Sequence, residues 1–157
     1  DFGHTVGEEL LTPTRVYAAD LLALIRTPGI DIHGLSHVTG GGLAANLARV
    51  LPHGVFARVD RSTWTPPAVF RTIGELGRVP ALDLERTLNM GVGFVAVLPA
   101  HQSDAAIEVC RAHGIPAWVL GEITGAENAP VDPAYEVVRG AKGVDGGSVQ
   151  VVGEFAS

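Results

Sequence analysis

Residues 34–43 read Gly34-Leu35-Ser36-His37-Val38-Thr39-Gly40-Gly41-Gly42-Leu43 and join an extended segment to a helix through three consecutive glycines. On the upstream side, residues 30–38 show the alternation of a strand. On the downstream side, Leu43, Leu47 and Val50-Leu51 have helical spacing, and the segment 52–54, Pro-His-Gly, ends that helix. The pattern predicts a strand, a glycine loop and a helix in that order.

This arrangement has a chemical use. The first amides of a helix have no intrahelical partner and lie at the positive end of the helix dipole, so they favour an anion such as a phosphate. Thr39 adds a hydroxyl, and His37 at the strand end could donate a hydrogen bond or move a proton. The alternative is a tight turn whose glycines serve packing alone. Both interpretations stay open at the level of the residues.

The remaining sequence alternates helical and strand-like segments. Tyr17, Leu21, Leu24 and Ile25 predict one buried helix face within residues 16–26, with its N-cap near Thr14. The residues 94–98 form a continuous apolar run typical of a central strand covered on both faces. Other helices are expected at about 68–76 (buried through Val69, Ile73 and Leu76), 82–88 and 103–113 (capped by Ser103-Asp104), and strands at 55–59 and 118–123, with a terminal hairpin of 136–139 and 149–152.

These segments predict an α/β fold, more fully an α+β layered arrangement in which a mixed β-sheet is flanked by helices. A mixed sheet is expected because two helical segments separate the strand at residue 55 from the strand at residue 94. At 157 residues, the chain 1–157 is expected to be a single domain.

Composition excludes several classes of partner and chemistry. The net charge is −6 and Lys142 is the only lysine, which argues against a nucleic-acid partner. Lys142 lies in a predicted hairpin turn, not in a phosphate-binding P-loop, and no Rossmann glycine fingerprint occurs. Cys110 is the only cysteine, so no internal disulfide can form and a reducing cytoplasmic location fits. The apolar run 91–100 is about half of the ~20 residues that span a bilayer, so no membrane partner is expected.

Other candidate sites are weaker. The segment Gly34-x-Ser36-x-Val38 lacks the second glycine of a hydrolase nucleophile elbow. His33 and His37 are four residues apart, but metal binding at that spacing needs a helix, so no metal site is predicted. The turn at 89–93, Asn-Met-Gly-Val-Gly, either aims the Asn89 amide at a ligand or caps the preceding helix. Glu8 and Glu9 read as a solvated approach to the first helix.

Four motifs occur together in order: Thr12-Pro13-Thr14-Arg15-Val16-Tyr17, the glycine loop, Asp60-x-x-x-Trp64, and Arg86-Thr87-Leu88-Asn89-Met90-Gly91-Val92-Gly93. With them, residues 7–152 resemble the C-terminal domain of phosphoribosylformylglycinamidine cyclo-ligase, also called aminoimidazole ribonucleotide synthetase. Leu88 departs from the family pattern, which usually has Phe there. That exchange concerns packing more than chemistry.

The resemblance implies an ATP-dependent ligase of de novo purine biosynthesis. ATP would phosphorylate the formamide oxygen of formylglycinamidine ribonucleotide, and the amidine nitrogen would then close the imidazole ring to give aminoimidazole ribonucleotide, ADP and phosphate. It also implies that an N-terminal domain, absent from this sequence, binds most of the ATP and Mg²⁺ and forms the homodimer. The chain would then be one half of a two-domain enzyme, inactive alone and partly ferredoxin-like in fold.

The family's site residues map by position. Thr39, Gly40, Gly41 and Gly42 would hold the phosphate of substrate or nucleotide, together with Arg86 and Gly91. His37 would polarise or protonate the oxygen that leaves as phosphate, and Asn89 would orient the substrate amide. Arg86 could pair instead with a local acid. No cofactor is expected on this chain alone.

Two alternatives are kept. One is another member of the same superfamily, such as formylglycinamidine synthase, selenophosphate synthetase, thiamine-monophosphate kinase or a hydrogenase-maturation protein. The other is a stand-alone module that binds a small anion on the same loop without catalysis. ATP-driven ring closure on addition of an N-terminal half would separate the enzyme from the module.

Overall fold

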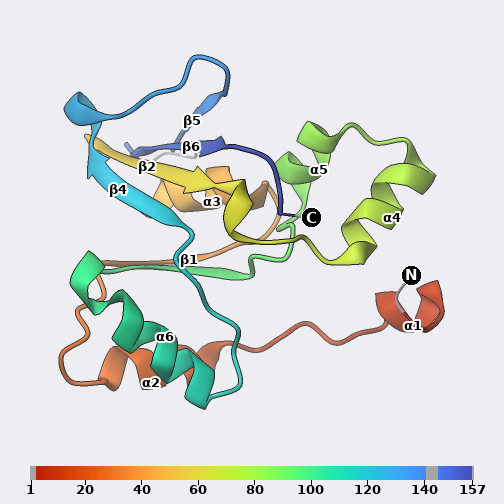
Figure 1. The fold of residues 1–157 in the computed structure, drawn as a ribbon, viewed down its shortest axis with the longest axis horizontal. Coiled ribbons are helices and arrows are strands. Elements are labelled where there is room, and N and C mark those ends of the chain that lie inside the picture. Colours follow the sequence, from red (N-terminus) through yellow and green to blue (C-terminus); the bar gives the residue numbers. More distant parts are fainter. Residues whose placement is uncertain (1–2, 141–144, 157) are drawn as a thin grey trace.

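The computed structural model describes residues 3–140 and 145–156. The helices are α1 (Val6–Leu10), α2 (Ala18–Arg26), α3 (Gly42–Val50), α4 (Ala68–Gly77), α5 (Ala81–Thr87) and α6 (Ser103–Ala112), with short 3-10 turns at Arg61–Thr63, Ala100–Gln102 and Ala126–Asn128. The strands are β1 (Gly34–His37), β2 (Val55–Asp60), β3 (Phe94–Val97), β4 (Gly121–Gly125), β5 (Val137–Arg139) and β6 (Ser148–Val152). Figure 1 shows the larger sheet above, β1 and β3 in the middle, and α2 with α6 below.

The larger sheet has the strand order β4-β2-β6-β5. Strand β2 runs antiparallel to β4 and parallel to β6, which confirms the predicted mixed sheet. Strands β5 and β6 pair antiparallel with Val138 opposite Val149, as expected for the terminal hairpin. The residues 141–144, including Lys142 of the predicted turn, lie outside the described residues.

Strands β1 and β3 form a separate two-stranded antiparallel sheet, with Gly34 opposite Val97 and His37 opposite Phe94. The prediction of a central strand at 94–98 was therefore wrong: within the described residues, β3 pairs with β1 alone. Its side chains are nevertheless half-buried on both faces, because Val95 and Val97 pack against the main core while neighbouring residues line a cavity facing α2 and α6. Two-sided burial of a ribbon gives the same apolar run as a central strand.

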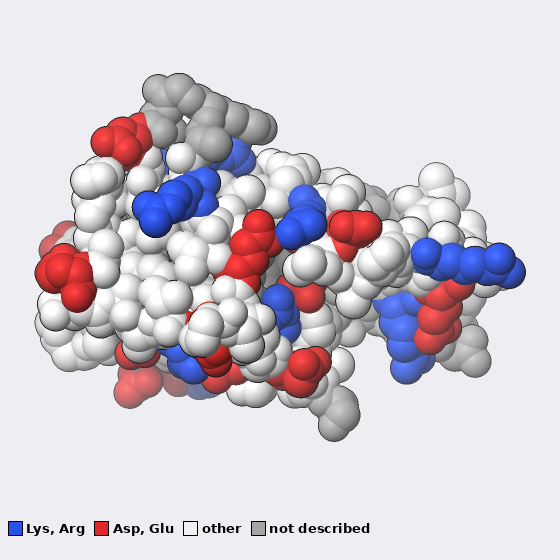
Figure 2. All heavy atoms as spheres, turned by 90° about the horizontal axis from the view of Figure 1, so that it is seen from above, with Lys and Arg blue, Asp and Glu red and all other residues white. Residues whose placement is uncertain are grey.

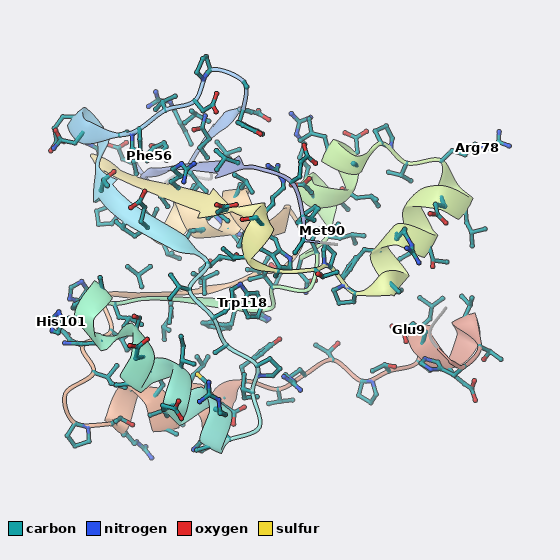
Figure 3. The ribbon with its side chains drawn as sticks, viewed as in Figure 1. Glu9, Phe56, Arg78, Met90, His101 and Trp118 are labelled. Carbon is teal, nitrogen blue, oxygen red and sulfur yellow. The ribbon has the colours of Figure 1, made fainter. Side chains whose placement is uncertain are left out.

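The main core lies between α3, the larger sheet and the ends of β1 and β3. Its buried members are Val38, Leu43, Leu47, Ala48, Leu51, Ala57, Val59, Trp64, Val92 and Val149. The apolar face of α3 thus supplies much of the core, as its helical spacing predicts. In Figure 3, Phe56 marks strand β2 and Met90 marks the turn between α5 and β3.

Helices α2 and α4 form within two residues of their predicted ranges, but their predicted burial is only partly confirmed. In α2 Leu24 is buried, whereas Ile25 is 47% exposed, and the N-cap is Tyr17 rather than Thr14. In α4 no residue is buried, and Leu76 is 76% exposed. Helical periodicity gives the apolar face, but only tertiary contacts decide whether that face is covered.

The boundaries of β1, β4 and α6 also differ from expectation. Strand β1 starts at Gly34 rather than at residue 30. The predicted strand at 118–123 is strand only from Gly121, and Trp118 and Val119 are exposed. The N-cap of α6 is Gln102 without a side-chain cap, since the Ser103 hydroxyl donates to the Ala100 carbonyl at 2.8 Å.

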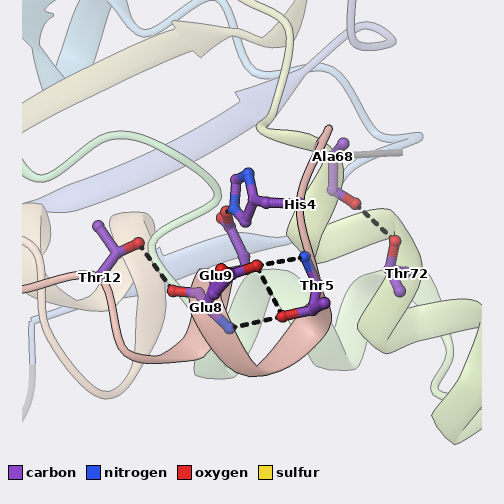
Figure 4. A network of polar contacts seen from close by, with 7 residues as sticks. All are labelled: His4, Thr5, Glu8, Glu9, Thr12, Ala68 and Thr72. Atoms are coloured by element: carbon purple, nitrogen blue, oxygen red, sulfur yellow. Dashed lines mark hydrogen bonds and ion pairs between the residues drawn. The ribbon is translucent and has the colours of Figure 1, made fainter.

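Helix α1 was not predicted. Figure 4 shows the capping box that begins it: the Glu8 amide donates to Thr5 Oγ1 at 3.2 Å, and the Thr5 amide donates to Glu8 Oε2 at 2.8 Å. These bonds hold the pKa of Glu8 below its ordinary value. The Thr5-x-x-Glu8 spacing was the signal that could have identified the helix. Glu8 and Glu9 therefore belong to α1, and their interpretation as a mere approach to a helix was wrong.

None of the helices formed by the described residues is long and apolar enough to cross a membrane. On the face seen in Figure 2, the described cationic and anionic side chains are interspersed and form no continuous basic surface.

Candidate functional site

The antiparallel pairing of β1 with β3 brings the two glycine motifs to one end of that ribbon. His37 lies opposite Phe94, and the Val38 amide donates to the Gly93 carbonyl at 3.0 Å. The chain leaves β1 into the Thr39–Gly42 loop and enters β3 from the 89–93 turn. Motifs about 50 residues apart in sequence thus form one site at the start of α3 (Figure 1).

The glycine loop turns sharply into α3. Gly41 has φ 102° and Gly42 has φ 71°, a region that favours glycine, and the Gly42 amide donates to the Thr39 carbonyl at 3.2 Å. Gly41 is the N-cap of α3, and no side chain caps the helix. Thr39, Gly40 and Gly41 are exposed. An uncapped and accessible helix start of this kind can donate amide hydrogens to an anion.

Asn46 is a residue that sequence reasoning missed. Its side chain is buried at 3% exposure, and its amide nitrogen donates to the carbonyls of Thr39, Gly40 and Gly42 at 3.1, 3.4 and 2.7 Å. The available signal was a polar residue beside Leu47 on the apolar face of a helix that opens with glycines. A buried amide must find partners, and here the partners are the loop carbonyls.

Gly42 has a packing role. It is buried, and a β-carbon on it would lie 1.8 Å from the Glu85 carbonyl oxygen of α5. A β-carbon added at Gly40, in contrast, would have no neighbouring atom within 4 Å. The two interpretations of the glycines therefore divide within the loop: packing requires Gly42, while exposed Gly40 has no such constraint.

His37 is exposed at the end of β1 and is held by aromatic neighbours. Its ring stacks on Phe94 with centroids 5.5 Å apart at 16°, and Tyr17 approaches edge-on at 6.1 Å. Tyr17 in turn covers Gly93, where a β-carbon would lie 1.8 Å from the phenol oxygen. The stacking fixes the ring without using its nitrogens, so they remain suited to a ligand.

Asn89 stabilises its own turn. Its Oδ1 accepts a hydrogen bond from the Gly91 amide at 3.0 Å, whereas α5 ends at Leu88 through a backbone bond to Leu84. The expectation that Asn89 caps the preceding helix was therefore wrong. Gly91 has φ 95° and is exposed, and a β-carbon there would meet Pro67 at 2.5 Å. The Asn89 amide nitrogen has capacity for a further acceptor.

Arg86, in the last turn of α5, contacts a carboxylate. Its Nη2 lies 2.6 Å from Glu136 Oε2, and Asp83 is 3.9 Å away. The hydrogen bond from Arg86 to Glu136 raises the pKa of Arg86. Both side chains of the Arg86–Glu136 pair are about half exposed, so a phosphate at Arg86 would compete with Glu136.

A cavity of about 770 Å³ lies beside this site. Tyr17, Gly91 and Phe94 line it near the site, and residues of α2, α6 and β4 line the remainder. Among the described residues, no group of three or more His, Cys, Asp or Glu could hold a metal ion. His33 instead lies 3.1 Å from Asp31.

The chain matches the family described as AIR synthase related protein, C-terminal domain, over residues 1–132, a range that includes both glycine motifs. It is 47% identical over 156 residues to a putative phosphoribosylformylglycinamidine cyclo-ligase of Streptomyces fradiae, covering 99% of this chain and 78% of that protein. It is 48% identical over 132 residues to the phosphoribosylformylglycinamidine cyclo-ligase of Sorangium cellulosum and 46% identical over 126 residues to that of Synechococcus sp. strain CC9605. Those alignments cover 84% and 80% of this chain but 38% and 36% of the relatives, so the chain spans little more than a third of their length.

Proposed function

The chain belongs to the family of AIR synthase related proteins as a C-terminal domain, and from this premise we propose that it is part of an ATP-dependent phosphoribosylformylglycinamidine cyclo-ligase of purine biosynthesis. The formamide oxygen of formylglycinamidine ribonucleotide attacks the γ-phosphorus of ATP and ADP leaves. The amidine nitrogen then attacks the activated carbon, and the oxygen departs as phosphate to leave aminoimidazole ribonucleotide.

One observation carries the proposal at the level of this chain: the glycine loop, His37 and the 89–93 turn converge at one end of the β1–β3 ribbon. In the proposed complex, the loop amides and Thr39 hold a phosphate of substrate or nucleotide. His37 donates a hydrogen bond to the oxygen as charge develops on it, which lowers the barrier electrostatically. Asn89 orients the substrate amide, and Arg86 with the Gly91 backbone borders the phosphate.

The remaining components of the proposed enzyme lie outside this chain. ATP and Mg²⁺ bind mainly to an N-terminal domain of the same polypeptide, which also forms a homodimer. The enzyme works in the cytoplasm. Binding of ATP outside this chain fits its single lysine, since binding a triphosphate requires clustered positive charge.

The test is the full-length protein that contains this chain, supplied with formylglycinamidine ribonucleotide, ATP and Mg²⁺. We expect one aminoimidazole ribonucleotide for each ADP released. His37→Ala should lower kcat by about 10²-fold, the usual size of a lost general acid or oxyanion donor. The matched control is His33→Ala, an exposed histidine paired with Asp31, which should retain normal turnover.

One result would contradict the proposed function and another the role of His37. Phosphate binding on the glycine loop without product formation would favour the non-catalytic anion-binding module. Normal turnover of His37→Ala would remove His37 from the mechanism while leaving the cyclo-ligase activity in place.

A further inference from the structure

We propose that Asn46 is a positioning residue that keeps the carbonyl groups of the glycine loop turned away from the phosphate, so that the loop presents only amide donors to the anion. The inference rests on the proposed function, since it concerns the same loop. It assigns a task to a buried side chain that does not itself touch the ligand.

The first step is the direction of the loop carbonyls. Thr39, Gly40 and Gly42 all direct their carbonyl oxygens to a single nitrogen, Asn46 Nδ2. A carbonyl oxygen facing a phosphate would repel it, because both carry negative charge. By accepting from Asn46, these carbonyls point into the protein, which leaves the opposite side of each peptide plane for the anion.

The second step is the orientation of the Asn46 amide. An asparagine side chain can be turned with its oxygen and nitrogen exchanged, and hydrogen-bond partners decide between the two. Arg49 Nη2 donates to Asn46 Oδ1, and a guanidinium has no acceptor capacity. The Thr39 hydroxyl also donates to Oδ1, at 3.4 Å. Arg49 therefore holds the oxygen on its own side and the nitrogen on the loop carbonyls.

The third step is burial. Asn46 is 3% exposed and lies one turn inside α3, with core residue Leu47 beside it. The Thr39 carbonyl also accepts from the Gly42 amide at 3.2 Å and Gly42 lies in the first turn of α3, so loss of the Asn46 nitrogen acts mainly on the Thr39 and Gly40 carbonyls, which are then free to turn outward. The loop, not α3 as a whole, would change.

The decisive variant is Asn46→Asp in the full-length protein. It keeps shape and the acceptor for Arg49 but places a carboxylate oxygen against three carbonyls. The matched control is Asn128→Asp, which adds the same charge at an exposed position whose side chain contacts Glu127. The substrate whose phosphate binds the glycine loop is either the ribonucleotide or ATP. We expect Asn46→Asp to raise the KM of that substrate at least about tenfold with kcat nearly unchanged, since the phosphate contact is the same in ground and transition states. Asn128→Asp should match the wild type.

A milder variant keeps the test decisive if Asn46→Asp does not fold. Arg49→Met removes the shorter of the two hydrogen bonds to Asn46 Oδ1 and leaves the one from the Thr39 hydroxyl, and it should raise the same KM by about threefold. Unchanged KM values for both substrates in a folded Asn46→Asp or Arg49→Met protein would overturn the proposal. A joint fall in kcat and thermal stability, without the KM change, would reduce Asn46 to a structural residue and overturn it as well.

A second readout is independent of the proposed reaction. Titration of the ¹⁵N-labelled full-length protein with inorganic phosphate should shift the Gly40 and Gly41 amide resonances in the wild type and in Asn128→Asp, and much less in Asn46→Asp. If the wild type makes no aminoimidazole ribonucleotide but shows this difference, the proposed function fails and the positioning role stands. Equal shifts in all three proteins would refute the role of Asn46.

Discussion

The backbone carbonyl of Glu85 points at the α-carbon of Gly42, so closely that a β-carbon at position 42 would lie 1.8 Å from that oxygen. This contact joins α5 to the first turn of α3. It places α5 and the 89–93 turn, which carry Arg86 and Asn89, against the glycine loop that follows His37. The geometry of the candidate site therefore depends on a packing contact in which neither partner needs to touch a ligand.

Gly42→Ala should destabilise the protein by about 2–4 kcal/mol, because the new methyl group meets backbone and because φ 71° is unfavourable for alanine. Gly40→Ala is the control within the same loop. It has no positive φ and no atom within 4 Å of the added carbon, so the free energy of unfolding should change by less than about 0.5 kcal/mol. Urea denaturation of both variants measures the difference, and equal stabilities would show that α5 can move away from Gly42.

Arg61 fixes the other side of α5. Its guanidinium donates to Glu85 Oε2 from Nε at 3.0 Å and from Nη2 at 2.8 Å, and Nη1 donates to the Val151 carbonyl at 2.7 Å. The two side chains are 11% and 19% exposed. Arg61→Ala should cost about 3 kcal/mol, because it leaves the largely buried Glu85 carboxylate without its cationic partner.

Arg111→Ala provides the comparison for Arg61→Ala. Its pair with Glu108 is about two-thirds exposed, so its loss should cost less than about 1 kcal/mol. Urea denaturation measures both variants. If Arg61→Ala and Arg111→Ala lower the free energy of unfolding by similar amounts, solvent replaces Arg61 at Glu85.

Much of this fold was predictable because local sequence dictates it. The strand, glycine loop and helix around His37, the mixed sheet and the terminal hairpin all follow from periodicity and glycine placement. The separation of β1 and β3 from the larger sheet was not predictable, since covering a ribbon with helices and covering it with strands give the same apolar pattern. The exposure of Leu76 likewise depends on what α4 packs against.

The candidate site, too, was only partly predictable from the sequence. His37, Thr39 and the glycines are marked by their residue types and spacing. Asn46 has only a weak sequence signal, a polar residue on the apolar face of a helix, and its contacts with the loop carbonyls required the structure. The Glu85 contact has no sequence signal, because it is made by a backbone carbonyl. Pairing of Arg86 with Glu136 joins residues 50 positions apart and also required the structure.

Asp60 should make stability depend on pH. Its carboxylate accepts a hydrogen bond from the Ser62 amide at 2.9 Å, and the bonds to Ser62 hold the pKa of Asp60 below its ordinary value. A lowered pKa in the folded state means that the contribution is complete above the unfolded pKa and is lost as pH falls through the folded pKa. The urea midpoint of the wild type should fall between about pH 5 and pH 3 more steeply than that of Asp60→Asn. If the urea midpoints of the wild type and Asp60→Asn depend on pH in the same way, the hydrogen bonds from Ser62 do not stabilise the Asp60 carboxylate.

Cys110 should react slowly with alkylating reagents. Burial, reinforced by the negative charge of Asp20, raises the pKa of the Cys110 thiol and so reduces the reactive thiolate. Iodoacetamide at pH 8 should therefore modify the folded protein several-fold more slowly than the urea-unfolded protein. Asp20→Asn should recover part of the difference, because burial is the larger cause. Modification at equal rates in the folded and unfolded protein would place the thiol in solvent.

Arg86 can bind a phosphate in the site only if its ion pair with Glu136 opens. The Arg86–Glu136 pair is half exposed, so Glu136→Gln should change the free energy of unfolding by less than about 1 kcal/mol. The same substitution removes the competing charge, so inorganic phosphate should bind more tightly than to the wild type, measured by titration calorimetry at constant ionic strength. Glu108→Gln, which frees Arg111 in a comparable exposed pair away from the glycine loop, should leave the affinity unchanged. If Glu136→Gln and wild type bind phosphate equally, Arg86 belongs to the surface of α5 and not to the site.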